Sequence, residues 1–175
     1  IDYIGATEEG VANMIANGKK NIAFVSASLS NPINGQHRLK GYKNALVNAN
    51  IAFDEALVFE CEPTLQNGEL LAEQLLEAGV DAAYVAGDEL AIGLLNAIIN
   101  AGVSVPEAFE VTASNNSRIT EMARPKLTSI MLPLYDIGAV AMRLLTKIMN
   151  KEEIDEKSII LPYKIVNRGT TLPKK

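Results

Sequence analysis

Short apolar runs alternate with amphipathic segments along most of the chain, and this alternation strongly limits the folds that the sequence can adopt. Runs such as Ile22-Ala23-Phe24-Val25 and Ala82-Ala83-Tyr84-Val85 are too short for helices and rich in residues that favour strands. The segments between such runs place apolar residues at helical spacing. Alternation with short connections implies right-handed crossovers. The sequence therefore predicts an α/β fold, with a parallel sheet flanked by helices.

Glycines mark the expected ends of several helices. Gly18, Gly79 and Gly102 each follow an amphipathic segment and are expected to terminate it. The predicted helices cover residues 7–15, 38–47, 65–76, 88–100 and 135–150, with a further short helix that ends before Pro125. The predicted strands cover residues 22–25, 57–59, 82–85, 109–112, 127–131, 159–161 and 164–166. The charged residues 151–157 are expected to form a solvated connection.

Composition narrows the class of protein. With 175 residues, 48% of them hydrophobic, the chain has the size and content of one globular domain or one lobe of a larger protein. Its net charge of −5 provides no positive field for the phosphates of nucleic acid, so direct DNA binding by these residues is not expected. A single cysteine, Cys61, cannot form an internal disulfide, which fits a reducing cytoplasm. Cys61 is expected to be a buried or half-buried apolar residue.

Polar loops follow the predicted strands at the edge where a parallel sheet usually binds ligands. These loops comprise residues 26–36, 60–64, 87–89 and 114–118. Their hydroxyls, amides and carboxylates match the donors and acceptors of a polyol such as a sugar. The same residue types form ordinary turns, and the spacing by itself favours the turn interpretation.

Three side chains near these loops are individually informative. Asp88 could hydrogen-bond a ligand hydroxyl or cap the helix that follows, and the cap is the favoured interpretation. Arg38 lies unfavourably near the start of a helix, which indicates an anionic partner, either a ligand or a nearby carboxylate. His37 is expected to be exposed. One histidine and one cysteine do not make a zinc site or a Ser-His-Asp triad, and no glycine-rich phosphate loop is present, so an enzyme is not predicted.

The predicted helix at residues 135–150 has two different faces. One side is lined by Gly138, Ala141, Leu145 and Ile148. The other is lined by Asp136, Val140, Arg143, Leu144 and Lys147. Arg143 and Lys147 are like charges four residues apart, an arrangement that costs about 0.2–0.5 kcal/mol unless an anion relieves it. The pattern suits docking of a phosphorylated partner and equally suits cations that offset the helix dipole, and both interpretations stay open.

Three stretches resemble, in order and spacing, the effector-binding core of the LacI/GalR family of transcription regulators. They are Asn21-Ile22-Ala23-Phe24-Val25-Ser26, Arg38-Leu39-Lys40-Gly41-Tyr42 and Asp88-Glu89-Leu90-Ala91-Ile92-Gly93. The resemblance covers essentially the whole chain and implies a periplasmic-binding-protein-like, three-layer αβα fold without enzymatic activity. Pro32-Ile33-Asn34 and residues 135–147 are similar to family members that control carbon catabolite repression in Gram-positive bacteria.

The resemblance also implies partners and sites. It implies a cytoplasmic homodimer whose corepressor is serine-phosphorylated HPr, a phosphocarrier protein, assisted by glucose 6-phosphate or fructose 1,6-bisphosphate. The docking surface of the family carries over to Asp136, Val140, Arg143, Leu144 and Lys147. The effector cleft carries over to Asn34, Arg38, Asp88 and Asn115.

One departure from the family concerns the late loop. Most relatives have a Gly-aromatic-Asp-Asn stretch where this chain has Ala113-Ser114-Asn115-Asn116. Because an amide replaces an acceptor-only carboxylate, a different pattern of ligand hydroxyls can be satisfied. The free-sugar ligand of the family is therefore not carried over to Asn115.

The resemblance divides the chain into two parts. Residues 1–126 and 158–175 are expected to form the C-terminal effector-binding subdomain, and residues 127–157 the crossover strand and helix of an N-terminal lobe. Operator DNA would be bound by a headpiece that lies outside these residues. Without that lobe, the apolar side of the 135–150 helix would need another cover, such as a second copy. A sugar-binding protein of a transport system is the alternative function with the same fold. An enzyme such as a sugar isomerase or nucleotidase is a third, but no converging carboxylates support it.

Overall fold

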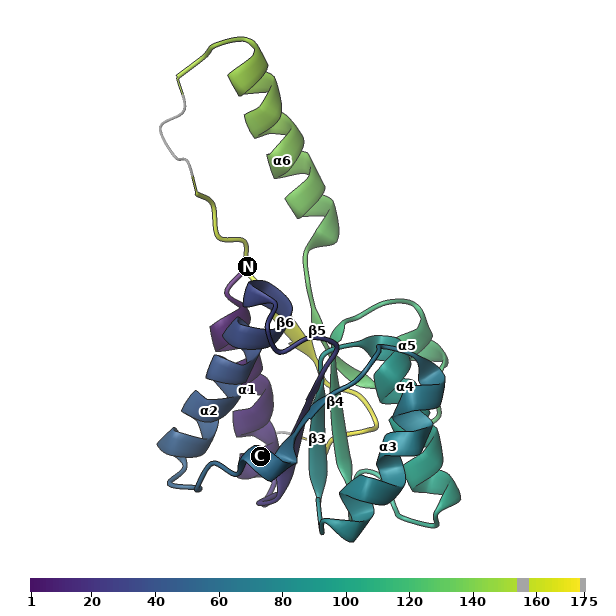
Figure 1. The fold of residues 1–175 in the computed structure, drawn as a ribbon. Coiled ribbons are helices and arrows are strands. Elements are labelled where there is room, and N and C mark those ends of the chain that lie inside the picture. Colours follow the sequence, from purple (N-terminus) through teal and green to yellow (C-terminus); the bar gives the residue numbers. More distant parts are fainter. Residues whose placement is uncertain (154–157, 174–175) are drawn as a thin grey trace.

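The computed structural model describes residues 1–153 and 158–173, with Asn34 described through its backbone alone (Figure 1). Within these residues the strands form one six-stranded sheet in the order β2-β1-β3-β4-β5-β6. The strands are β1 (Ile22–Ser26), β2 (Val58–Glu60), β3 (Ala82–Val85), β4 (Glu110–Asn115), β5 (Thr128–Met131) and β6 (Lys164–Val166). The first five are parallel, which confirms the predicted parallel sheet, and β6 adds an antiparallel edge.

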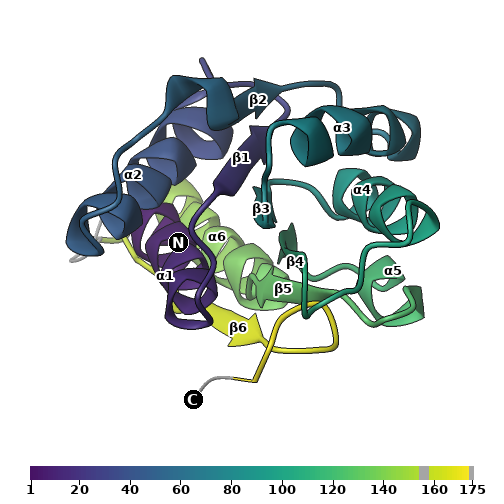
Figure 2. The same ribbon diagram turned by 90° about the horizontal axis from the view of Figure 1, so that it is seen from below.

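Helices cover both faces of the sheet, as the sequence predicts. They are α1 (Tyr3–Ala16), α2 (Arg38–Asn48), α3 (Leu65–Glu77), α4 (Asp88–Asn100), α5 (Ile119–Met122) and α6 (Leu134–Met149). A π-helical segment, η1 (Pro32–His37), and a short 3-10 helix, η2 (Glu55–Leu57), lie in the connections on either side of α2. Helices α1 and α2 lie on one face, with α3 and α4 on the other (Figure 2). This arrangement confirms the three-layer αβα fold.

A hydrophobic core lies on each face because successive strand residues point to opposite sides. Phe24 and Tyr84 pack towards α1 and α2, and their stacked rings have centroids 5.9 Å apart. Val25 and Val85, the next residues along, pack towards α3 and α4. Both faces of β1 and β3 are therefore buried, which explains why their sequences are continuously apolar rather than alternating.

Glycines permit two features of the helical layers. Gly18, Gly79 and Gly102 have φ values of +95°, +69° and +80°, so each ends its helix in the left-handed conformation that the sequence predicts. Gly93 serves a different purpose, because a Cβ at this position would collide with the backbone carbonyl oxygen of Leu65. The missing side chain lets α3 and α4 approach closely on their face of the sheet.

Several element boundaries differ from prediction. Residues 159–161 do not form a strand, and the prediction of one there is wrong: Ile160 is 72% exposed and β6 begins only at Lys164. Pro162 follows the apolar run and cannot donate a ladder hydrogen bond. Helix α1 begins earlier than predicted because Asp2 accepts a hydrogen bond from the N–H of Gly5. Residues 151–153 are exposed as expected, and the rest of the 151–157 stretch lies outside the described residues.

Helix α6 stands apart from the rest of the fold. It projects from the end of the sheet where β5 terminates (Figure 1), and none of its residues is buried. The exposed large apolar side chains of α6, between 48% and 87% exposed, are Leu134, Tyr135, Met142, Leu145, Ile148 and Met149. Within the described residues, no helix is long and apolar enough to cross a membrane.

Candidate functional site

A cavity of about 350 Å³ opens at the carboxyl ends of β1, β3 and β4. It is lined by Ala27, Arg38, Pro63, Ala86, Gly87, Asp88, Glu89, Asn115, Ser117 and Ile119. The strand order reverses between β1 and β3, and open α/β sheets bind ligands beside such a reversal. The fold therefore forms a hollow at the edge of the sheet where the sequence places the ligand site.

The structure brings three of the four predicted effector residues together. Arg38 at the start of α2, Asp88 at the start of α4 and Asn115 at the end of β4 all line this cavity. The side chain of Asn34 lies outside the described part of the chain. Sequence reasoning did not single out the apolar wall formed by Ala27, Pro63, Ala86 and Ile119. The only sequence signal for these residues is their position just after predicted strands or near them.

Arg38 is a buried cation at the edge of the cavity. It is 3% exposed, and its guanidinium carbon lies 5.2 Å from the centroid of the Tyr3 ring. Its Nη2 donates to Asn115 Oδ1 over a long 3.5 Å. Among the described residues, no carboxylate lies within 4.0 Å of this guanidinium. A nearby acid therefore does not supply the anion that the position of Arg38 indicates, and a ligand could.

Asp88 is not a helix cap, so the favoured sequence interpretation is wrong. The cap position of α4 is Gly87, and the Asp88 side chain makes no cap hydrogen bond. Its Oδ2 accepts a hydrogen bond from the N–H of Ser117 at 2.7 Å, and its Oδ1 accepts one from Ser129 Oγ at 3.3 Å. Burial raises the pKa of Asp88 above its ordinary value, although these hydrogen bonds partly oppose the shift.

The turn after β4 is held in an unusual conformation. Asn115 and Asn116 have φ values of +109° and +54°, in the region that glycine normally occupies. The Asn116 N–H donates to Ser129 Oγ at 3.1 Å. This conformation lets both Asn115 and Ser117 face the cavity, so the geometry of the site depends on whatever holds the turn.

Helix α6 carries a second candidate surface. Asp136 and Arg143 are exposed, whereas Val140, Leu144 and Lys147 are half-buried. No carboxylate in residues 1–153 or 158–173 lies within 4.0 Å of Arg143 or Lys147. Lys147 is in the last turn of α6, where it offsets the helix dipole, but Arg143 lies before that turn. The helix dipole therefore accounts for Lys147 but not for Arg143.

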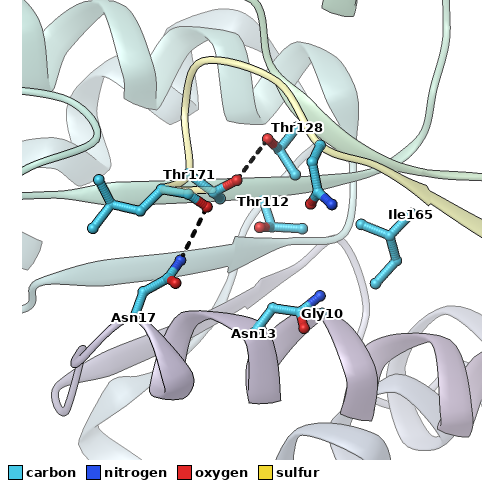
Figure 3. Close-up of a pocket in the computed structure, with 9 residues that line it drawn as sticks. Gly10, Asn13, Asn17, Thr112, Thr128, Ile165 and Thr171 are labelled. Carbon is cyan, nitrogen blue, oxygen red and sulfur yellow. Dashed lines mark hydrogen bonds between the residues drawn. The ribbon is translucent and has the colours of Figure 1, made fainter. Parts of the chain in front are cut away.

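A smaller pocket between α1 and the sheet is not a ligand site (Figure 3). Its volume of about 10 Å³ suits roughly one water molecule. Across it, Asn17 Nδ2 donates to the carbonyl oxygen of Leu172 at 3.3 Å, and the hydroxyls of Thr128 and Thr171 are 2.9 Å apart (Figure 3). These contacts attach the C-terminal segment to the sheet.

The lone cysteine and the lone histidine of the chain both lie in the surroundings that the sequence predicts. Cys61 is half-buried against the core beside α3 and α4, as predicted, and burial raises its pKa. His37 is exposed, also as predicted. Across the part of the chain that the structure describes, no three His, Cys, Asp or Glu side chains gather as metal ligands would.

The fold and the cleft define a class of ligand-binding domain, and comparison with known proteins gives the same class. A family model described as a periplasmic binding protein-like domain matches residues 11–171, and the chain belongs to that family. Among its members, the chain is similar to the effector-binding domains of LacI-family transcription regulators. A solved LacI-family regulator from Enterococcus faecium with bound ribose has a TM-score of 0.86 and 27% identity, over 99% of this chain and 65% of that one.

Higher similarity is to catabolite control protein A. The protein of that name from Streptococcus mutans is 52% identical over 171 residues, which cover 98% of this chain and 51% of the relative. The crystal structure of the regulator CcpA of Lactococcus lactis has a TM-score of 0.93 and 46% identity, over 98% of this chain and 63% of that one. The chain thus spans about half the length of the curated relatives it matches.

Proposed function

We propose that this chain is the effector- and corepressor-binding part of a regulator of carbon catabolite repression, and that it has no enzymatic activity. The observation that carries the proposal is the pair Arg143 and Lys147 on α6, which has no carboxylate partner among the described residues. Similarity to catabolite control protein A along nearly the whole chain supports it.

The proposed corepressor is serine-phosphorylated HPr, docked on α6. A phosphoserine carries about −1.5 to −2 charges and three acceptor oxygens, which match two cations one turn apart. Val140 and Leu144, half-buried beside the cations, supply apolar contact area, and Asp136 lies at the start of the same helix. The combination suits a partner with a phosphate at the edge of an apolar patch.

A sugar phosphate, glucose 6-phosphate or fructose 1,6-bisphosphate, is the proposed effector in the cleft. Its phosphate would meet the buried guanidinium of Arg38, which has only a long hydrogen bond to Asn115. The sugar hydroxyls would meet the Asn115 amide and the edge of the Asp88 network. A cavity of about 350 Å³ is within the usual range for small-molecule sites.

The alternative function is sugar binding for transport, with a neutral sugar in the cleft. The relative with bound ribose supports a sugar as the ligand class. The uncompensated charge of Arg38 favours the phosphorylated ligand over the neutral one, since a neutral sugar would leave a buried cation without an anion.

The proposed molecule has further parts. Residues 127–157 would pack on an N-terminal lobe, and the exposed apolar side chains of α6 support this because they need a cover. A headpiece outside these residues would bind operator DNA, in the cytoplasm. The proposed homodimer would use the apolar groove of about 540 Å³ that Leu65, Ile92 and Met122 help to line between α3, α4 and α5.

Calorimetric titration of the whole protein with HPr, phosphorylated and unphosphorylated, tests the proposal. The wild type should bind the phosphorylated form at least about tenfold more tightly, because only that form can make charge-assisted hydrogen bonds with the two cations. Arg143→Ala combined with Lys147→Ala should abolish that preference. Equal affinity of the wild type for both forms of HPr would refute it.

A matched control is available on the same chain. Lys20 and Lys126 are exposed, and they precede β1 and β5 at the opposite end of the sheet from α6. The Lys20→Ala, Lys126→Ala variant loses the same net charge and should keep the preference for phosphorylated HPr. An equal loss in this variant would mean that net charge, and not the α6 surface, determines binding.

A further inference from the structure

Arg168, which follows β6, connects four groups around the turn after β4. Its side chain is 10% exposed. The Nη1 atom donates to the carbonyl oxygen of Leu127 at 2.8 Å and to Thr120 Oγ1 at 3.3 Å. The Nη2 atom donates to Asn116 Oδ1 at 2.8 Å and to Glu121 Oε1 at 3.3 Å. Arg168 does not line the effector cavity.

Asn116 is the partner that links Arg168 to the cleft. Two successive asparagines in the left-handed region are strained, and such a turn persists only where its surroundings hold it. The backbone N–H of Asn116 is held by Ser129, and its Oδ1 atom accepts a 2.8 Å hydrogen bond from Arg168 and a longer one, at 3.4 Å, from Thr120 Oγ1. The residues on either side of Asn116 are Asn115 and Ser117, which line the cavity.

The two contacts of the Arg168 Nη2 atom, with Glu121 and with Asn116, differ in how much they can stabilise. Glu121 is 66% exposed, and ion pairs with exposed partners contribute little because water screens them. The shorter hydrogen bond to Asn116 is partly buried, and a planar guanidinium restricts both the position and the orientation of the amide there. The contact with Asn116 is therefore the one that can fix the turn.

We propose that Arg168 is a positioning residue for effector binding: by holding the Asn116 amide, it keeps Asn115 and Ser117 at the wall of the cavity. The inference deepens the proposed function, because it assigns a residue outside the cleft to the affinity of that cleft. Loss of the guanidinium would let the turn relax from its left-handed conformation and move the Asn115 amide relative to Arg38.

Three variants of the whole protein test this role. Arg168→Met removes all the donors and keeps most of the aliphatic side chain. Arg168→Lys keeps the charge, but its single ammonium group cannot reach all four acceptors that the two guanidinium nitrogens contact. Glu121→Gln is the matched control, since it removes the exposed ion pair and leaves Asn116 bound. The measurements are calorimetric affinity for glucose 6-phosphate and fructose 1,6-bisphosphate, well below each variant's unfolding temperature, and the amide resonances of Asn115, Asn116 and Ser117 without ligand.

We expect Arg168→Met to weaken effector binding at least about tenfold and Glu121→Gln to keep an affinity within about twofold of the wild type. The affinity of Arg168→Lys should lie between those of the wild type and Arg168→Met. The three amide resonances should shift in Arg168→Met and keep their positions in Glu121→Gln. A purely structural role would lower the unfolding temperature and leave the affinity of the folded protein unchanged, and that result would overturn the inference. Should Arg168→Met fail to fold, Arg168→Lys carries the same comparison.

The resonances separate this inference from the proposed function. If the wild type binds neither sugar phosphate, the effector part of the proposed function is wrong, and the resonances alone then decide whether Arg168 positions the turn. Unshifted resonances in the Arg168 variants would overturn the inference whatever the ligand.

Discussion

The carboxylate of Asp88 accepts a 2.7 Å hydrogen bond from the backbone N–H of Ser117, which joins the first residue of α4 to the turn after β4. The second carboxylate oxygen accepts from Ser129 on β5. One buried side chain thus connects a helix, a turn and a strand at the edge of the cleft. The arrangement makes Asp88 a determinant of cleft geometry as well as a cavity-lining residue.

Asp88→Asn should destabilise the protein by about 1–3 kcal/mol, because the amide offers one acceptor where two are used. Its NH₂ group would face Ser129 Oγ, which already accepts from the N–H of Asn116. Urea denaturation at neutral pH measures the change. Glu89→Gln is the control: the neighbouring side chain is exposed, so that substitution should stay within about 0.5 kcal/mol. Equal effects of the two substitutions would refute the linking role of Asp88.

Arg38→Met should stabilise the fold and lower its affinity for the effector. The methionine keeps apolar contact with Tyr3 and removes a buried cation that has no nearby carboxylate, so the free energy of unfolding should rise by about 1–2 kcal/mol. Affinity for a sugar phosphate should fall more than about tenfold, because a charge-assisted hydrogen bond is lost.

Denaturation and calorimetry on the same samples test both halves of the Arg38 prediction. Lys40→Met is the control, because Lys40 is exposed and lies two residues along α2, where side chains do not share a face. Unchanged effector affinity in Arg38→Met would show that the cavity does not bind the phosphate through this residue.

Glu110→Gln should change how stability depends on pH. Glu110 on β4 is fully buried; its Oε1 accepts from the Leu172 N–H and from Asn17 Nδ2, both at 2.9 Å. Its Oε2 has no partner within the described residues. Burial raises the pKa of this carboxyl above its ordinary value of 4.5, despite the opposing hydrogen bonds.

The native state therefore holds the Glu110 proton to higher pH than the unfolded state does. The stability that this provides is fully present below the unfolded pKa and is lost as pH rises through the folded pKa. Relative to the wild type, Glu110→Gln should gain about 1.4 kcal/mol per unit of pKa difference across that window. Urea denaturation of both proteins from about pH 4 to about pH 8 gives the difference, and the titration of Asp88, whose pKa is raised in the same direction, is common to both proteins and cancels in it. A difference that is constant with pH would contradict the prediction.

Gly93→Ala should destabilise the protein by about 2–4 kcal/mol, because the new methyl group collides with the Leu65 carbonyl and pushes α3 from α4. Higher helix propensity returns at most about 1 kcal/mol. Gly10→Ala is the matched control: its Cβ would lie 3.4 Å from the nearest atom, on the Tyr84 ring, so the change should stay within about 1 kcal/mol. Thermal or urea denaturation compares the two variants. Similar stability of Gly93→Ala and Gly10→Ala would mean that α3 and α4 can move apart without strain.

The layers of the fold could be predicted because burial on both faces leaves a local mark in the sequence. Runs such as residues 22–25 and 82–85 are apolar throughout, and glycines end the helices between them. Residues 159–161 have an equally apolar run, yet they pair with no strand among the residues that the structure describes. Whether an apolar run becomes a strand depends on a neighbour at the sheet edge, which lies far away in the sequence and leaves no local mark.

The site was predictable in position and less so in detail. The topology brings strand ends together, so Arg38, Asp88 and Asn115 could be expected near one another. The partners of Asp88 could not, because a cap is a local contact whereas Ser117 and Ser129 reach it through the packing of the sheet. Arg168 gave no signal at all: it lies 52 residues from Asn116, outside every motif.

The strands on either side of α6 have a mechanical consequence. Strand β5 leads out to the helix and β6 returns from beyond it, and the two are paired antiparallel, with Met131 opposite Lys164 and Ser129 opposite Val166. The end of the strand that leads to α6 and the start of the strand that follows it therefore lie side by side in the sheet. A displacement of the helix would reach the sheet through this pair, where Met131 lies in register with the cavity residue Asn115 and Ser129, two residues before it, bridges Asp88 and Asn116.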